Sequence, residues 1–419
     1  MNQVAKDRAD AFQTVLQYHQ ATKHRFQGHA RGPGYLDWAT QPNPFRRFEG
    51  ARLVPLERIP PTDEPRYDDA FVQGRIPPAS VNVRSISQLF YDSLAVSAWK
   101  SIGETSWALR VNPSSGNLHP TEGYLICGPI EGLCDVPMVC HYAPKEHVLE
   151  VRSEFGFGLW TKLCEGFPSD TLFLGLTSIH WREAWKYGQR AYRYCQHDTG
   201  HAIGGMSIAA AGLGWQTTIL DDLGADELAL LMGTVWDYGA EREEPDVLMA
   251  VVPCVTDTKE SGLPQAQVLA FASLDWQGTP NQLSPSHVDW GMDEPAAATR
   301  KPRGLGRYES FHDPLAASSL DVRCVSLRKM IRQRRSAVAM DGETRIDRET
   351  FYRILQRTLA ISGTMPFRTL PWKPHLHLAI FVHRIDDLPP GLYFLVRDCS
   401  QRRALEGALT RVGRWRRPL

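Results

Sequence analysis

The sequence lacks the features of several large classes of protein. No run of eighteen uncharged apolar residues occurs, and the N-terminus has no apolar signal-peptide core, so we expect neither a secreted nor a membrane-spanning protein. The eight cysteines form no Cys-x-x-Cys pair and no finger-like spacing with histidine. Neither a zinc site nor a disulfide framework is therefore expected. We predict reduced thiols and a cytoplasmic location.

The chain also lacks an excess of charge of either sign. Lys plus Arg number 47 and Asp plus Glu number 47, so no global field draws the protein to nucleic acid or to an anionic membrane. We expect neither as a partner. The C-terminus is the exception, because Glu406 alone opposes a group of arginines there, for which a solvated tail is the simplest interpretation. These are Arg402, Arg403, Arg411, Arg414, Arg416 and Arg417.

Common catalytic signatures are missing as well. No Gly-x-Gly-x-x-Gly follows a strand pattern, and no Walker loop, Gly-x-Ser-x-Gly or His-Glu-x-x-His occurs. Rossmann-type nicotinamide binding, NTP hydrolysis, serine hydrolysis and zinc proteolysis are therefore unsupported. His197 and His201 lie on one helical face with Asp198 between them, but no third metal ligand follows at a suitable spacing. We predict no metal and interpret this segment as a helix rich in small residues.

The length of 419 residues favours two domains. We predict an N-terminal extension over 1–78, a first domain over 79–275, a linker over 276–320 and a partial second domain over 321–419. Periodicity predicts helices at 5–21, 85–100, 192–212, 326–336 and 348–359, and strands at 216–220, 376–382 and 391–396. Helices and strands in separate runs favour an α+β fold. The second domain looks incomplete because it has only about half the residues of the first.

The most informative segment is the run Arg110-Val-Asn-Pro-Ser-Ser-Gly-Asn-Leu-His-Pro-Thr-Glu122. Its first proline fixes one φ, two serines can satisfy nearby backbone groups, a glycine frees one position, and Pro120–Glu122 can open a helix. Such a loop presents backbone N–H groups, which can hold the extra charge of a reduced flavin ring. A purely structural turn before a helix has the same ingredients, and these residues alone do not decide between the two.

This run resembles the flavin-edge loop of the nitroreductase superfamily, and specifically of the branch that includes the SagB-type azoline dehydrogenases. Three further stretches are similar to the family in the same order, at 18–24 with 36–38, at 141–150 and at 182–194, so that the resemblance covers most of residues 10–235. It implies a nitroreductase-like fold with FMN as cofactor. The residues that it assigns to FMN binding are Arg110, Asn112, Pro113, Ser114, Ser115, Gly116 and Asn117.

The second region carries a weaker resemblance. Arg334, Arg335 and Ser336 are similar to the signature that holds the FMN phosphate in nitroreductases, and residues 377–393 are similar to the strands that follow it. Two guanidinium groups and a hydroxyl suit a phosphate dianion, although a solvated basic helix end is a common alternative. Because nitroreductases enclose flavin between two subunits, the resemblance implies a tandem pseudo-dimer with an incomplete second copy. A truncated reading frame would explain the missing part.

Lys186 and Tyr187 stand among Arg182, Arg190 and Arg193. We expect the arginines to push the lysine toward its neutral form, and a neutral amine or a phenolate could remove a proton while hydride leaves the neighbouring carbon. The alternative is a positively charged, solvated helix face. The Lys-Tyr pair resembles the catalytic pair of azoline dehydrogenases, which implies a catalytic role for both residues.

Together these expectations describe an FMN-dependent oxidoreductase that acts by hydride transfer on an unidentified small molecule or azoline-containing peptide. The sequence leaves open whether NAD(P)H is the electron donor and whether the protein forms a homo-oligomer. The alternative is a degenerate flavin-binding or interaction protein without turnover. The sequence does not identify the substrate, because variable segments build the pocket of this fold.

Overall fold

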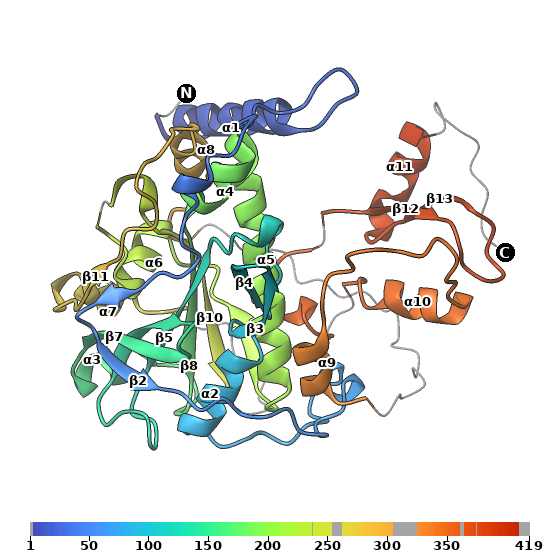
Figure 1. The fold of residues 1–419 in the computed structure, drawn as a ribbon. Coiled ribbons are helices and arrows are strands. Elements are labelled where there is room, and N and C mark those ends of the chain that lie inside the picture. The colour runs from blue at the N-terminus through green and yellow to red at the C-terminus, as the bar shows by residue number, and fades with distance from the viewer. Residues whose placement is uncertain are drawn as a thin grey trace. The chain divides into compact units, whose positions relative to one another are not determined.

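The computed structural model describes residues 3–236, 238–253, 262–304, 325–360, 364–373 and 375–409. The chain divides into two compact units (Figure 1). The first comprises Met1–Arg307 and Cys324–Arg334, and the second comprises Tyr308–Arg323 and Arg335–Leu419. The basic helix α9 (Leu327–Gln333) therefore belongs to the first unit, whereas the composition predicts that it opens the second domain.

The first unit is built on a seven-stranded antiparallel sheet with the strand order β2-β7-β6-β5-β8-β10-β9. Strands β5, β6 and β8 are buried along their whole length. Continuous burial means that both faces of the sheet are covered. The strands are β2 Arg52–Pro55, β5 Thr121–Cys127, β6 Met138–Ala143, β7 Val148–Glu154, β8 Leu172–Ser178, β9 Gln216–Ile219 and β10 Glu244–Val252.

Helices pack on both faces of the sheet. Side chains alternate across a strand, and β5 shows this alternation: a Cβ at Gly123 would approach Met206 of α5, whereas Tyr124 joins an apolar cluster under α6 and α7. The helices of the first unit are α1 Gln3–Thr22, α2 Val83–Tyr91, α3 Phe157–Leu163, α4 His180–Tyr187, α5 Ala191–Ala211, α6 Ala225–Met232, α7 Gln265–Ala270, α8 Asp293–Ala298 and α9.

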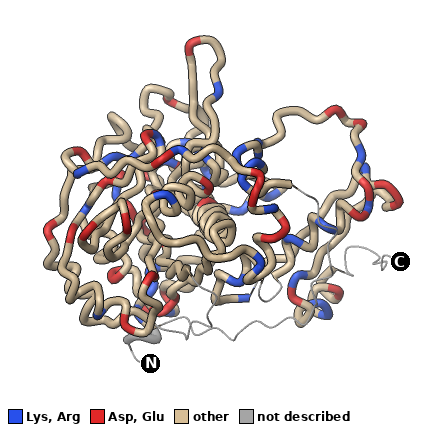
Figure 2. Tube along the Cα trace, turned by 90° about the horizontal axis from the view of Figure 1, so that it is seen from below, with Lys and Arg blue, Asp and Glu red and all other residues tan. Residues whose placement is uncertain are grey.

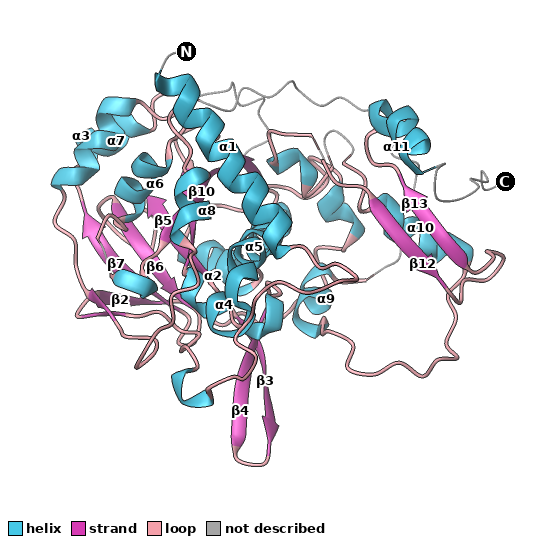
Figure 3. Ribbon diagram, turned by 90° about the horizontal axis from the view of Figure 1, so that it is seen from above, coloured by secondary structure: helices cyan, strands magenta, loops and turns pink. Residues whose placement is uncertain are grey.

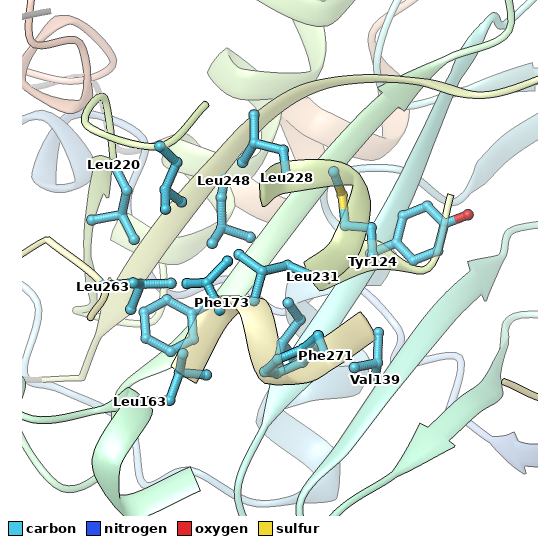
Figure 4. Packing of buried hydrophobic residues seen from close by; sticks show 14 of the residues in the cluster. Tyr124, Val139, Leu163, Phe173, Leu220, Leu228, Leu231, Leu248, Leu263 and Phe271 are labelled. Atoms are coloured by element: carbon cyan, nitrogen blue, oxygen red, sulfur yellow. The ribbon is translucent and has the colours of Figure 1, made fainter. Parts of the chain in front are cut away.

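The apolar cluster under α6 and α7 is the main core (Figure 4). Phe173 and Leu248 come from the sheet, and Leu231 and Phe271 come from the covering segments. All four side chains are fully buried. Burial of each such side chain contributes about 1.5–3 kcal/mol, so this face anchors the sheet that carries the candidate site on its other side.

Two smaller strand pairs complete the first unit. The hairpin of β3 (Val96–Ile102) and β4 (Thr105–Arg110) extends away from the main sheet (Figure 3). Strand β1 (Phe48–Glu49) pairs with β11 (Thr279–Pro280). Figure 2 shows basic and acidic residues interspersed along the chain, as the equal numbers of the two signs predict. No helix in the described ranges is long and apolar enough to cross a membrane.

The second unit contains α10 (Arg348–Gln356), the hairpin of β12 (Leu378–Val382) and β13 (Gly391–Leu395), and α11 (Arg402–Leu409). Phe351 of α10 packs with Val382, Ile385 and Leu388 in a small core of its own. The helix and both strands were predicted from periodicity, with ends that differ by a few residues. The predicted basic tail at 411–417 lies outside the described residues.

Three predicted elements differ from the structure. The helix predicted over 85–100 ends at Tyr91, because the Asp92 backbone N–H caps it and the β-branched and aromatic residues of Val96–Ile102 then form β3. Pro120–Glu122 opens no helix, because the backbone from Thr121 onward pairs with β8. Residues 276–304 of the predicted linker contain β11 and α8 and belong to the first unit; residues 305–320 lie outside the described ranges.

Candidate functional site

The loop between β4 and β5 has a left-handed backbone at three positions. Gly116 has φ 60°, Asn117 has φ 62° and His119 has φ 52°. Non-glycine residues rarely adopt this region unless local hydrogen bonds hold them there. Here the Asn117 side-chain amide donates to the Ala108 carbonyl at 2.9 Å, and the His119 backbone N–H donates to Ser114 Oγ at 2.7 Å. The loop is therefore a fixed structure.

Asp198 of α5 ties this loop to that helix. Its carboxylate is 1% exposed and accepts hydrogen bonds from the Ser115 backbone N–H at 3.1 Å and from the Ser115 hydroxyl at 3.2 Å. Hydrogen bonds to a charged acceptor are stronger than those between neutral groups. Asp198, which the sequence places only between two histidines, is thus the anchor of the loop.

A buried charge network positions α4 beside the loop. Arg182 pairs with Glu122 of β5, and His141 bridges Glu122 at 2.9 Å and Glu150 at 2.8 Å. Burial opposes charge here, but the neighbouring arginine and histidine outweigh it and hold the pKa of Glu122 at about 2. The two carboxylates likewise outweigh burial and raise the pKa of His141 to about 9.

Lys186 and Tyr187, the predicted catalytic pair, lie against the loop at the end of α4. A Cβ placed at Gly116 would stand 2.7 Å from the Tyr187 hydroxyl oxygen and 3.0 Å from Lys186 Nζ. Glycine suits position 116 because of its positive φ, and an added Cβ would require the ends of the Tyr187 and Lys186 side chains to shift. The structure brings together the predicted catalytic residues and the predicted flavin-edge loop, which are about seventy residues apart in the sequence.

The predicted ring of arginines around Lys186 is wrong. Arg182 is buried in the network with Glu122, and the side chains of Arg190 and Arg193 hydrogen-bond Thr22 near the end of α1. Gly188, with φ 53°, ends α4 and directs the following residues away. The acidic residue nearest to Lys186 along α4 is Glu183, one turn earlier on the same helix.

Glu183 is a site residue that the sequence reasoning missed. Its side chain is fully buried, and neither carboxyl oxygen has a hydrogen-bond partner of ordinary geometry among the described residues. Burial and the neighbouring charge of Asp198 raise its pKa well above the ordinary value. The i, i+3 and i, i+4 spacing from Glu183 to Lys186 and Tyr187 is the signal that could have found it.

The predicted FMN-binding residues fall into two groups. Ser114, Ser115, Gly116, Asn117 and Pro113 lie at least partly exposed on the loop. Arg110 and Asn112 are buried, and the Arg110 guanidinium donates to the carbonyls of Thr121 and Pro44. Its guanidinium therefore supports the loop from beneath.

Arg334 reaches the same loop, because its guanidinium donates to the Val111 carbonyl at 3.2 Å. This hydrogen bond lies within the first unit. Arg335 and Ser336 are exposed and belong to the second unit. Of the predicted phosphate-binding set, the structure thus places Arg334 beside the loop.

The loop has donors and acceptors that suit a flavin edge. Among the described residues, no hydrogen bond is formed by the backbone N–H of Ser114 or of Gly116, and the buried Asn112 side-chain oxygen has no partner. Buried polar atoms without a partner are rare in folded proteins, and a bound ligand is one of the things that can satisfy them. The residues present therefore fit a planar group with hydrogen-bonding heteroatoms on its edge.

Other parts of the first unit offer less evidence of a functional site. A cavity of about 510 Å³ lies between α6 and β10, away from the loop, and its arginines Arg242 and Arg300 are paired with carboxylates. No group of three or more His, Cys, Asp or Glu side chains within the described ranges is arranged to hold a metal ion. His197 and His201 accordingly form no such cluster.

The chain was compared with known proteins. No family model matches it, and no curated protein matches at a significant level. Its structure is similar to that of a provisionally named nitroreductase from Anabaena variabilis, with a TM-score of 0.62 and 19% sequence identity over 94% of this chain and 81% of that chain. The likeness extends over nearly the whole chain and therefore concerns the fold as a whole.

Two further solved structures match part of this chain loosely. A chain of the E. coli microcin synthetase McbBCD complex with truncated pro-MccB17 bound has a TM-score of 0.34 and 19% identity, over 48% of this chain and 70% of that chain. A provisionally named nitroreductase from Ralstonia eutropha has a TM-score of 0.34 and 14% identity, over 52% of this chain and 96% of that chain. These two matches are too loose to carry an argument. The match to the Anabaena protein confirms the predicted fold: the chain has the α+β fold of the nitroreductases.

Proposed function

We propose that the chain is an FMN-dependent oxidoreductase of the nitroreductase type. The observation that carries the proposal is the contact of Lys186 and Tyr187 with Gly116 of the loop, because it joins a proton-transfer pair to a row of hydrogen-bond donors. The nitroreductase-like fold supports the same function. Bound FMN would supply the two-electron chemistry, accepting or donating hydride.

The loop would hold the flavin ring and Arg334 would approach its phosphate end. The backbone N–H groups of Ser114 and Gly116 are the donors that remain for the ring edge, with Pro113, Ser115 and Asn117 fixing the loop. Arg110 supports the loop through its hydrogen bonds to the Thr121 and Pro44 carbonyls, and the Asn112 side-chain oxygen would accept a hydrogen bond from the flavin. Phosphate binding by Arg335 and Ser336 stays a prediction from the sequence, where it rests on the affinity of guanidinium groups for phosphate oxygens.

Lys186 and Tyr187 would divide the proton chemistry. Burial and the nearby acidic groups raise the pKa of Tyr187 to about 12, so its phenol keeps its proton at neutral pH and acts as a hydrogen-bond donor. Lys186 is left as the group that accepts or returns a proton while hydride moves to or from the neighbouring carbon. We propose a small molecule or an azoline-containing peptide as substrate, and NAD(P)H as a candidate donor.

The test begins with purified full-length protein titrated with FMN while the quenching of flavin fluorescence is followed. The loaded protein is then photoreduced without oxygen and mixed with nitroaromatics, quinones and azoline peptides. We expect saturable binding and acceptor-dependent reoxidation, with Lys186→Gln and Tyr187→Phe slowing reoxidation by about a hundredfold. Lys162→Gln, an exposed lysine on α3, serves as control.

Two results would count against the proposal. Protein that takes up no FMN would reject the flavin site altogether. Saturable binding without acceptor-dependent reoxidation would reject the oxidoreductase function and leave a flavin-binding protein without turnover.

A further inference from the structure

A buried pair of carboxyl groups lies beneath the loop, on the side of Lys186. Glu183 of α4 and Asp198 of α5 are both almost completely buried, and α4 packs along α5. Asp198 is engaged by Ser115, as described above, whereas the oxygens of Glu183 have no partner of ordinary geometry within the described part of the chain. Two adjacent buried carboxyl groups do not both carry a negative charge at neutral pH.

The groups that face Glu183 determine which carboxyl holds the proton. Asp198, Lys186 and Ser114 lie close enough to shift the pKa of Glu183, and Tyr187 and Cys195 lie close enough to sense its carboxylate. Burial and the charge of Asp198 raise the pKa of Glu183, whereas the charge of Lys186 lowers it, and the net pKa is raised well above the ordinary value. The Ser115 backbone N–H and hydroxyl both donate to Asp198, whereas the Glu183 oxygens have no such donor among the described residues, so the proton of the pair lies on Glu183.

The pair has an exit to solvent. His201, one turn along α5 from Asp198, places Nδ1 3.5 Å from the Asp198 carboxylate. Its side chain is 47% exposed. Histidine is suited to pass protons between a buried acid and water near neutral pH. At the inner end, Glu183 lies one helical turn from Lys186, where side chains of a helix are neighbours.

We propose that Glu183, Asp198 and His201 form a proton path that connects Lys186 with solvent. The inference rests on the proposed role of Lys186 as proton acceptor. In one passage, an N–H bond of the Lys186 ammonium breaks as an O–H bond forms on one oxygen of Glu183. The proton already on Glu183 moves to Asp198 and from there to His201, which releases it to water. No electrons are transferred, and Lys186 returns to the amine form that the next turnover requires.

Glu183→Gln interrupts the path at its inner end, because an amide of the same shape cannot exchange a carboxyl proton. We expect this variant to keep the melting temperature and FMN affinity of the wild type, while turnover falls by about a hundredfold. His201→Ala interrupts the path at its exposed end, where water can partly substitute, so a fall of about tenfold is expected.

Rescue by added imidazole separates a proton path from a merely structural role. Imidazole should restore turnover of His201→Ala, because the lost side chain is half exposed, and it should leave Glu183→Gln unchanged, because that site is closed to solvent. Glu165→Gln, an exposed carboxyl, is the matched control. Wild-type turnover in Glu183→Gln, or no rescue of His201→Ala, would overturn the proposal.

Infrared spectroscopy tests the proton on Glu183 without any cofactor. The apo protein at pH 7 should show the carbonyl band of a protonated carboxylic acid, which shifts in heavy water and is lost in Glu183→Gln but kept in Glu165→Gln. Absence of a band that depends on Glu183 would refute the path. Because this readout is independent of flavin, a chain that fails to bind FMN but shows the band would reject the proposed function and not the protonated carboxyl.

Discussion

The buried histidine between two glutamates makes the stability of the first unit fall in alkaline solution. His141 donates to or pairs with Glu122 and Glu150 inside the sheet, and its pKa rises from the ordinary 6.5 to about 9. When folding raises the pKa of a histidine, the histidine stabilises the folded state fully at pH values below its pKa in the unfolded chain. This stabilisation is lost as the pH rises through its pKa in the folded protein. The window for His141 is therefore pH 6.5 to 9.

The magnitude follows from the width of this window. At about 1.4 kcal/mol per pH unit, the interval from 6.5 to about 9 corresponds to about 3 kcal/mol of unfolding free energy. We expect His141→Gln to be less stable than the wild type at pH 6, and its stability to change much less between pH 6.5 and 9. His147→Gln is the matched control, since burial lowers the pKa of His147 to about 4 and confines its effect to the acid side.

Guanidinium denaturation followed by tryptophan fluorescence measures these free energies at a series of pH values. The unfolding free energies of variant and wild type are compared at the same unfolding transition, because the two units of the chain need not unfold together. Parallel loss of stability in the wild type and His141→Gln across pH 6.5 to 9 would refute a protonated histidine between the glutamates.

Two further substitutions test the structure that positions the site. Glu122→Gln should lower the unfolding free energy by about 3–5 kcal/mol, because it leaves two buried cations without their shared carboxylate. The control Glu154→Gln, at an exposed carboxylate, should change the unfolding free energy by less than about 1 kcal/mol. Equal losses in the denaturant midpoint for the two variants would count against the network. Gly175→Ala places a methyl group against Met232 and should lower the unfolding free energy by about 1–3 kcal/mol. Gly158→Ala lies in α3, where an added Cβ meets nothing within 4 Å, and should raise the unfolding free energy by about 0.5–1 kcal/mol. Thermal melting that shows the same sign for both glycines would contradict the packing described here.

Local patterns allowed much of the fold to be predicted. The small residues from 192 to 212 predict the helix found at Ala191–Ala211, and the hairpin strands of the second unit follow from runs of apolar and aromatic residues. The loop and the Lys186–Tyr187 pair were singled out from sequence, and the structure places them in contact. Short motifs carried this information because the residues of each motif are close in the chain.

What could not be predicted depends on contacts between distant segments. Thr121–Glu122 belong to a strand because β8 supplies the backbone partners. Arg110 is buried because the Pro44 carbonyl accepts its hydrogen bond. Glu183 lies one helical turn from Lys186 in the sequence, but its burial beside Asp198 follows only from the packing of α5 on α4. Each of these outcomes was decided by tertiary packing, for which local composition holds no signal.

Titration of FMN into the Gly116→Ala variant tests whether the loop from Arg110 to Glu122 binds flavin. An added Cβ at this left-handed position would collide with the Tyr187 hydroxyl and approach Lys186 Nζ. Gly103→Ala is the matched control, because it has nearly the same φ, 59°, with nothing within 4 Å. We predict saturable FMN binding by the wild type and by Gly103→Ala. Gly116→Ala should bind FMN at least about tenfold more weakly, which corresponds to a loss of about 1.4 kcal/mol of binding free energy. Equal affinity in all three proteins, or no binding by the wild type, would contradict a flavin site at this loop.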